Sequence, residues 1–144
     1  MSYTAMAHSH VERMMREAME LDGEITQDCD GAYPLRHGDA AYLLSVGRGG
    51  HMVKIWSQAV FGLKHTAAVL REVNEANEQL VHCRVYLASG TLVVEAFLPI
   101  ETLIPGYLAA VCCEVGTISD RMGHLMAAVH GGIVVPDFAS EDAG

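Results

Sequence analysis

The sequence predicts an α+β fold in which one antiparallel sheet carries helices on one face. Short segments with alternating apolar and polar residues are joined by glycine-containing turns, which is typical of hairpin strands. Helical periodicity occurs before, between and after two groups of such strands. The predicted order is helix, three strands, helix, two strands, helix, in a single domain at 1–144 with an ordered core at about 8–132.

The first helix is predicted to begin at Ser9, because Ser9 and Glu12 have the spacing of a capping box. Gly23 is predicted to end it. In the turn-rich passage that follows, Tyr33–His37 are predicted to form a short strand. Pro34 has no N–H to donate to a neighbouring strand, so this strand belongs at a sheet edge.

Two further strands, Ala41–Val46 and Met52–Phe61, are predicted to form a hairpin. Alternation along the second strand assigns one of its faces to the core and the other to the outside. The predicted core face carries Val53, Ile55, Ala59 and Phe61, and the outer face carries Met52, Lys54, Trp56 and Gln58.

The next helix is predicted to span roughly Thr66–Leu80, with an apolar stripe from Val69 to Leu80. Asn74 and Asn77 lie beside this stripe. Asparagine is a poor residue inside a helix, because its amide competes for backbone groups. We predict that both amides tie the end of the helix to the following strand; the alternative is that they bind a ligand.

The clearest local signal is the hairpin in which Ser89–Gly90 joins HCRVYLA to TLVVEAFLP. This turn sets a register in which Arg84 faces Glu95 as a surface ion pair, Tyr86 faces Val93, and His82 faces Phe97. The other side of the hairpin is uniformly apolar and is predicted to be core: Cys83, Val85, Leu87, Leu92, Val94 and Ala96.

The last helix is predicted to begin at Pro105 and to end at Gly131–Gly132. Its apolar stripe is Leu108, Val111, Val115, Ile118, Met122, Leu125 and Val129. A second line contains small residues only, and each interior glycine costs about 1 kcal/mol relative to alanine. The line therefore predicts a close neighbour, which we interpret as a second copy of the chain: Ala109, Cys112, Gly116, Ser119, Gly123 and Ala127.

Together these pieces resemble the YbjN-type, type III secretion chaperone-like family. The resemblance covers roughly residues 8–132 and rests on DGAYPLRHGDAAYLLSV, LREVNEANEQL and CRVYLASGTLVVEAFLP with the long closing helix. In the family pattern a helix ending in L-N-x-x-N precedes a hairpin; Asn74 and Asn77 occupy those places, with Val73 where leucine is usual. The resemblance implies a small acidic homodimer that binds peptide segments of other proteins without chemistry.

The net charge of −9 disfavours nucleic-acid binding, because such a surface repels phosphate. No apolar run approaches the about 20 residues of a membrane span, so we expect a soluble, cytoplasmic protein. A mean hydropathy of +0.21 predicts that some apolar surface is covered by another molecule. Residues 136–144 are predicted to form a loose acidic tail.

The eight histidines and four cysteines form no recognisable metal-binding or catalytic motif. We therefore expect no metal, no cofactor and no catalytic residue, and we interpret the chain as a non-enzymatic peptide-binding module. The alternative is an enzyme that binds a metal or small molecule with histidines and cysteines across a dimer cleft.

The outer side of the sheet is the predicted recognition surface for an unknown client protein or peptide. Amphipathic aromatic residues among charged ones are typical of partner surfaces. The alternative is that this side forms the dimer contact or lies beneath a helix. The predicted partner-binding residues are Met52, Trp56, Tyr86, Val93 and Phe97.

Overall fold

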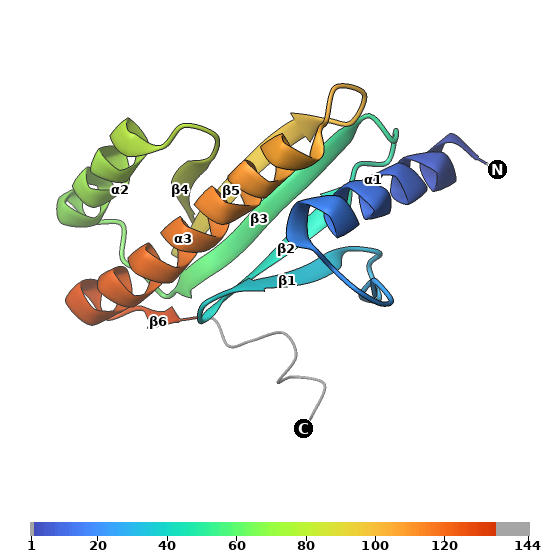
Figure 1. Ribbon diagram of the computed structural model, residues 1–144. Coiled ribbons are helices and arrows are strands. Elements are labelled where there is room, and N and C mark those ends of the chain that lie inside the picture. The colour runs from blue at the N-terminus through green and yellow to red at the C-terminus, as the bar shows by residue number, and fades with distance from the viewer. Residues whose placement is uncertain (1, 135–144) are drawn as a thin grey trace.

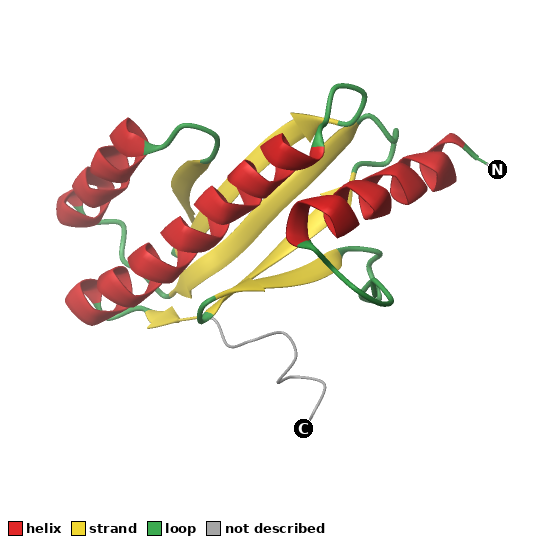
Figure 2. Ribbon diagram, in the orientation of Figure 1, coloured by secondary structure: helices red, strands yellow, loops and turns green. Residues whose placement is uncertain are grey.

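The computed structural model describes residues 2–134 of the chain, so the predicted tail at 136–144 lies outside the described residues. One sheet and three helices form two layers, with α3 crossing the sheet and α1 beside it (Figures 1 and 2). The elements are α1 (Tyr3–Met19), β1 (Tyr33–His37), β2 (Ala40–Val46), β3 (Met52–Phe61), α2 (Ala67–Gln79), β4 (Arg84–Ala88), β5 (Thr91–Pro99), α3 (Pro105–His130) and β6 (Ile133–Val134).

The strands form one antiparallel sheet in the order β1-β2-β3-β5-β4, which confirms the predicted fold class and the edge position of β1. The sheet has one strand more than the sequence predicts, because β6 pairs with the end of β3. With two residues, β6 is too short to show an alternating pattern.

The β4–β5 hairpin has the predicted register, with Arg84 opposite Glu95 and Tyr86 opposite Val93. Ser89 and Gly90 both have positive φ, at 49° and 81°, as a two-residue turn that follows the strand twist requires. His82 precedes β4, so its predicted pairing with Phe97 does not form.

The core lies between the sheet and the helices, and the predicted core face of β3 needs one correction. A register shift between Gln58 and Val60 places Val60 in the core, and it leaves Phe61 38% exposed. Strict alternation holds only along a regular strand, so the irregularity reverses the sides of the residues that follow it.

The first helix begins six residues before the predicted start. Ser2 caps α1, with its hydroxyl accepting a hydrogen bond from the Ala5 amide at 3.1 Å, and Glu20 rather than Gly23 caps its other end. The capping box at Ser9 is therefore wrong. The apolar stripe that α1 buries already includes Ala7, which explains why the helix extends upstream.

The long helix α3 begins at Pro105 and is capped by Gly131 in the left-handed conformation, as predicted. Near its end the apolar stripe differs from the prediction, because Leu125 and Val129 are exposed and Met126 is buried in their place. Among residues 2–134, no helix is both long enough and apolar enough to cross a membrane.

The small-residue line of α3 faces the chain's own sheet. Cys112, Gly116, Ser119 and Gly123 are buried there, and Ala109 is half-buried at the start of the line. A Cβ added to Gly116 would lie 2.4 Å from the Cβ of His37 in β1. The close neighbour that the small residues predict is therefore the sheet of the same chain, so most of this line is covered and is not available to a second copy.

The two asparagines of α2 differ in their surroundings. The Asn77 side chain donates a hydrogen bond to the Val85 carbonyl and accepts one from the Val85 amide, both at 2.8 Å. Both residues are exposed, but the Asn74 amide makes no hydrogen bond within the described part of the chain. The predicted tie from helix to strand is confirmed for Asn77 and wrong for Asn74.

Candidate functional site

The side of the sheet that faces away from α1 and α3 is called the outer face here. Strands β3, β4 and β5 supply it, and their registers put Trp56, Glu95 and Arg84 in one row across the sheet. Because side chains alternate along a strand, residues two apart share this side. The outer-face residues of these strands include Met52, Lys54, Trp56, Gln58, Arg84, Tyr86, Val93, Glu95 and Phe97.

Four of the five predicted partner-binding residues are accessible on the outer face. Phe97 is 52% exposed and Met52 is 39% exposed, while Trp56 and Tyr86 are half-buried. Val93 is buried and lies opposite Tyr86, so it is part of the floor of the surface rather than a contact that a partner reaches. The predicted direct role of Val93 therefore needs correction.

A buried carboxylate lies at the centre of the outer face. The Glu95 side chain is 3% accessible and accepts hydrogen bonds from Arg84 Nε at 2.7 Å, Arg84 Nη2 and the Tyr86 hydroxyl at 3.0 Å. Arg84 bonds Oε1 of this carboxylate and Tyr86 bonds Oε2, and Lys54 Nζ lies 3.9 Å from Oε2. The sequence predicts the pairing with Arg84 but is wrong about exposure, because strand alternation does not reveal how far the neighbouring long side chains cover a residue.

The same cations lie over the aromatic rings of the outer face. Lys54 Nζ is 4.8 Å from the ring centroid of Trp56 and 5.9 Å from that of Phe97, and the Arg84 guanidinium is 4.8 Å from that of Tyr86. Cation–π attraction at such distances restrains both partners. The rings are therefore held in place before any partner arrives, which lowers the entropy cost of binding.

This arrangement is suited to non-covalent binding. Both Glu95 oxygens accept hydrogen bonds from neighbouring side chains, and the carboxylate is only 3% accessible, so it is shielded from a substrate. Burial, followed by the hydrogen bond to Glu95, raises the pKa of Tyr86, so its hydroxyl stays protonated. The outer face therefore offers apolar rings and cationic heads to a partner.

Cys83 and Cys112, two of the thiols available to the enzyme alternative, lie in surroundings that disfavour a reactive thiolate. Burial raises the pKa of Cys112 to about 12, and burial together with the Glu114 carboxylate raises that of Cys83 to about 12. Both thiols are therefore protonated at neutral pH and are poor nucleophiles. His37 hydrogen-bonds Thr117, whose hydroxyl also lies 3.9 Å from Cys113 Sγ, and His82 makes an edge-to-face contact with Tyr107, so the two rings have different neighbours.

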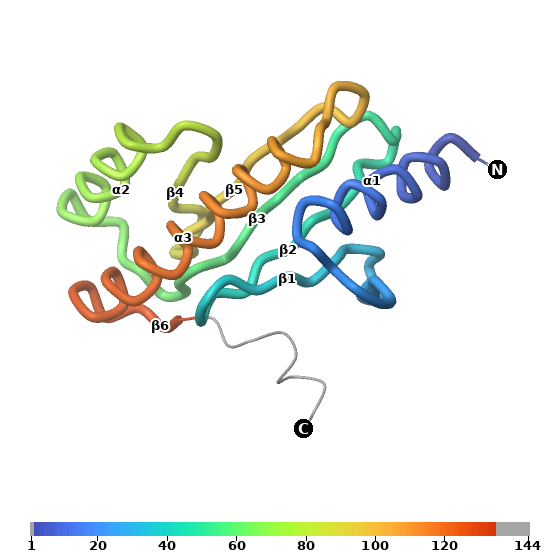
Figure 3. Tube along the Cα trace, in the orientation of Figure 1, coloured from blue at the N-terminus to red at the C-terminus, as the bar shows by residue number. Residues whose placement is uncertain are grey.

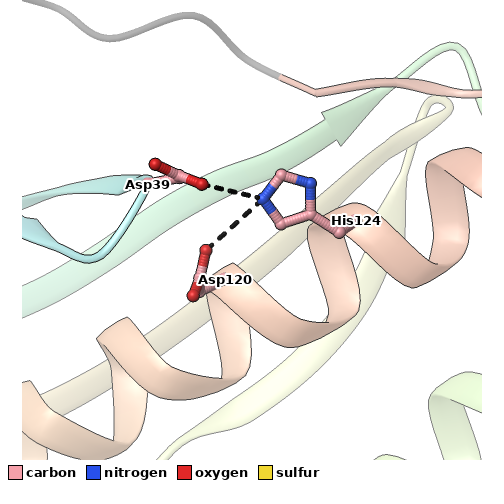
Figure 4. A group of neighbouring side chains, drawn as sticks. All are labelled: Asp39, Asp120 and His124. Carbon is pink, nitrogen blue, oxygen red and sulfur yellow. Dashed lines mark ion pairs between the residues drawn. The ribbon is translucent and has the colours of Figure 1, made fainter.

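One group within residues 2–134 has the composition and spacing to hold a metal ion, namely Asp39, Asp120 and His124 (Figure 4). No metal site is expected from the sequence, so this group is one that the sequence does not reveal as a whole. The spacing of Asp120 and His124, one helical turn apart, is a detectable signal. Asp39 carries no such signal, because only the fold brings its turn to α3.

The chain matches a family described as T3SS (YopN, CesT) and YbjN peptide-binding chaperone 1, over residues 5–137. No curated protein matches it closely enough to count as a relative.

Solved structures with a similar fold include secretion chaperones. A chain of the HopA1–SchA chaperone–effector complex is 12% identical with a TM-score of 0.63, and the match covers 83% of this chain and 97% of that one. The Yersinia pestis type III secretion chaperone SycH, in complex with a YscM2 fragment, is 16% identical with a TM-score of 0.59, and the match covers 83% of this chain and 98% of that one. YbjN from E. coli is 13% identical with a TM-score of 0.55, and the match covers 87% of this chain and 96% of that one. At these identities the likeness shows the fold alone.

Proposed function

Because the chain belongs to the family of T3SS and YbjN peptide-binding chaperones, we propose that it is a non-enzymatic, chaperone-like module that binds a peptide segment of a client protein on its outer face. The carrying observation is the set of accessible rings of Trp56, Tyr86 and Phe97 on one side of a sheet. Tryptophan and tyrosine are enriched among the few residues that supply most of the binding energy at protein interfaces.

The charges of the outer face favour a particular kind of segment. Lys54 and Arg84 place two cationic heads among the rings, while the neighbouring carboxylate of Glu95 is buried. A segment that alternates apolar and acidic side chains would pack on the rings and pair with these heads. The net charge of −9 repels acidic partners in general. Close to Lys54 and Arg84 the local attraction outweighs this repulsion, because salt screens the more distant charges.

The test is binding of peptides selected from a displayed random library against the full chain. Trp56→Ala and Tyr86→Ala should each weaken the selected peptides by about 30-fold, since loss of a central aromatic contact costs about 2 kcal/mol. Tyr107→Ala is the matched control, because Tyr107 is an exposed aromatic residue on α3. Unchanged affinity in both outer-face variants, with unchanged melting temperatures, would contradict the proposal.

We propose further that the module acts as a homodimer. Leu125 and Val129 are 57% and 58% exposed, and their four-residue spacing puts them side by side on α3. These side chains support a helix contact between copies in place of the small-residue line. Light scattering should give twice the chain mass, and Leu125→Glu should give a monomer. A dimer that is instead split by Trp56→Ala would assign the outer face to self-association.

The chemistry of the cysteines supports a cytoplasmic location. Cys29, Cys83, Cys112 and Cys113 are all free thiols. Free thiols persist in reducing compartments. After rapid lysis and denaturation, a thiol reagent should label all four cysteines. Cysteines that the reagent labels only after a reductant is added would contradict a cytoplasmic location.

A further inference from the structure

The polar cluster of Asp39, Asp120 and His124 has the geometry of an unassigned metal site. His124 Nε2 lies 3.6 Å from Asp39 Oδ2 and 3.5 Å from Asp120 Oδ1, and the three ligand atoms lie within 4.8 Å of one another. Two ligands that are each ~2.1 Å from a metal ion are separated by ~3.0 to ~3.4 Å in octahedral or tetrahedral geometry. The two histidine–carboxylate separations need shifts of only a few tenths of an ångström, and the separation of the two carboxylates, which is at most 4.8 Å, would close as the exposed Asp39 side chain turns toward the ion.

Separate parts of the chain build the cluster. Asp120 and His124 lie one turn apart on α3, and Asp39 lies in the turn between β1 and β2, which approaches the second half of α3 in Figure 3. Gly38 has φ of 60°, and a Cβ there would lie 3.0 Å from Asp120 Oδ2. Glycine at this position therefore lets the turn and the Asp120 carboxylate come together.

An independent observation beside the cluster points to a bound group. Ser119 is 3% exposed, its hydroxyl has no hydrogen-bond partner among residues 2–134, and it lines the same small cavity as the three cluster residues. The buried oxygen Asp120 Oδ1 has no hydrogen bond in this part of the chain either, and it lies 3.5 Å from His124 Nε2. The cavity volume of about 20 Å³ is large enough for one water molecule or one ion. Unpaired buried polar atoms are rare in folded proteins, so a group that satisfies them is expected.

We propose that Asp39, Asp120 and His124 bind one divalent first-row transition-metal ion, which clamps the β1–β2 turn to α3. An imidazole nitrogen favours such ions over Ca²⁺ and Mg²⁺, which prefer oxygen ligands throughout. Water completes the coordination sphere, because the Asp39 side chain is 82% exposed and the His124 side chain 57%. The Ser119 hydroxyl donates a hydrogen bond to that water. This proposal is independent of peptide binding on the outer face.

The test is titration of the full chain with Mn²⁺, monitored by the electron paramagnetic resonance signal of free Mn²⁺. This ion is chosen because the exposed thiols of Cys29 and Cys113 bind it poorly. One saturable site is expected, together with a higher melting temperature, since a ligand that binds only the folded state stabilises it. His124→Gln and Asp120→Asn should each weaken the site by about tenfold or more.

The matched control is His51→Gln. His51 lies 3.9 Å from Glu101 in another exposed histidine–carboxylate pair, so this variant removes one imidazole outside the cluster and should keep the site. Asp39→Asn provides a variant that is safe for folding, because Asp39 lies in an exposed turn. Absence of a saturable site would overturn the proposal and leave water as the group in the cavity. Equal weakening by His51→Gln, or none by Asp39→Asn, would overturn it as well.

Discussion

Replacing Asn77 by alanine tests how the fold protects an exposed sheet edge. β4 is the last strand of the sheet, so its outward backbone groups have no neighbouring strand. The Asn77 amide takes the place of such a strand, because it bonds both the N–H and the C=O of Val85 at 2.8 Å. Covering an edge with a helix is a general means of preventing unwanted strand pairing.

The two hydrogen bonds set the expected magnitude. Val85 is 2% exposed, so water reaches its backbone groups poorly once the amide is gone. Each unsatisfied buried group costs about 1 to 3 kcal/mol. Alanine is a better helix former than asparagine by about 0.6 kcal/mol, which offsets part of this loss. The free energy of unfolding of Asn77→Ala should therefore fall by about 1.5 to 5 kcal/mol, which is roughly 5 to 20 °C in melting temperature for a chain of this length.

Asn74→Ala is the matched control for this experiment. It makes the same substitution one turn earlier in α2, where the amide is exposed and unbonded within the described residues. It should leave the melting temperature unchanged or raise it slightly. Thermal melting followed by circular dichroism measures both variants. Equal melting temperatures for Asn77→Ala and Asn74→Ala would refute the reasoning.

Two further changes test contacts of α3. The Glu114 carboxylate accepts hydrogen bonds from the backbone amides of Val81, His82 and Cys83, so Glu114→Ala should cost about 2 kcal/mol on thermal melting. Burial alone would raise the pKa of Glu114, but these hydrogen bonds outweigh it and lower the pKa. The contribution of Glu114 to the free energy of unfolding is therefore fully present above pH 4.5 and is lost as the pH falls through the lowered pKa. A gap between wild type and variant that stays constant into acid would contradict this. Gly116→Ala should cost about 1 to 3 kcal/mol in chemical denaturation by overpacking against β1, whereas Gly106→Ala, with nothing within 4 Å, should not destabilise.

The fold was predictable because its signals are local. Alternation, the Ser89–Gly90 turn and the proline and glycine that bound α3 each depend on residues close together in the chain. The errors occur where a longer-range or irregular feature decides the outcome. A register shift reverses Phe61, and an upstream cap at Ser2 moves the start of α1. The small-residue line was detected correctly, but its partner was assigned to a second copy instead of to β1.

The candidate sites were predictable to different degrees. The outer face follows from strand periodicity, so most of its aromatic residues could be named from the sequence. The burial of Glu95 could not, because it depends on Arg84, Tyr86 and Lys54 converging from two other strands. The metal cluster combines a helix with a distant turn, so no local pattern contains all of its members.

The most direct test of peptide binding on the outer face uses the indole N–H signal of Trp56. The chain contains one tryptophan, so a nitrogen-15 spectrum shows a single indole resonance from the centre of this surface. Titration with a library-selected peptide should shift that resonance together with the backbone signals of β3, β4 and β5. A peptide that binds and shifts signals of α1 or α3 while the indole resonance stays in place would contradict the proposed function.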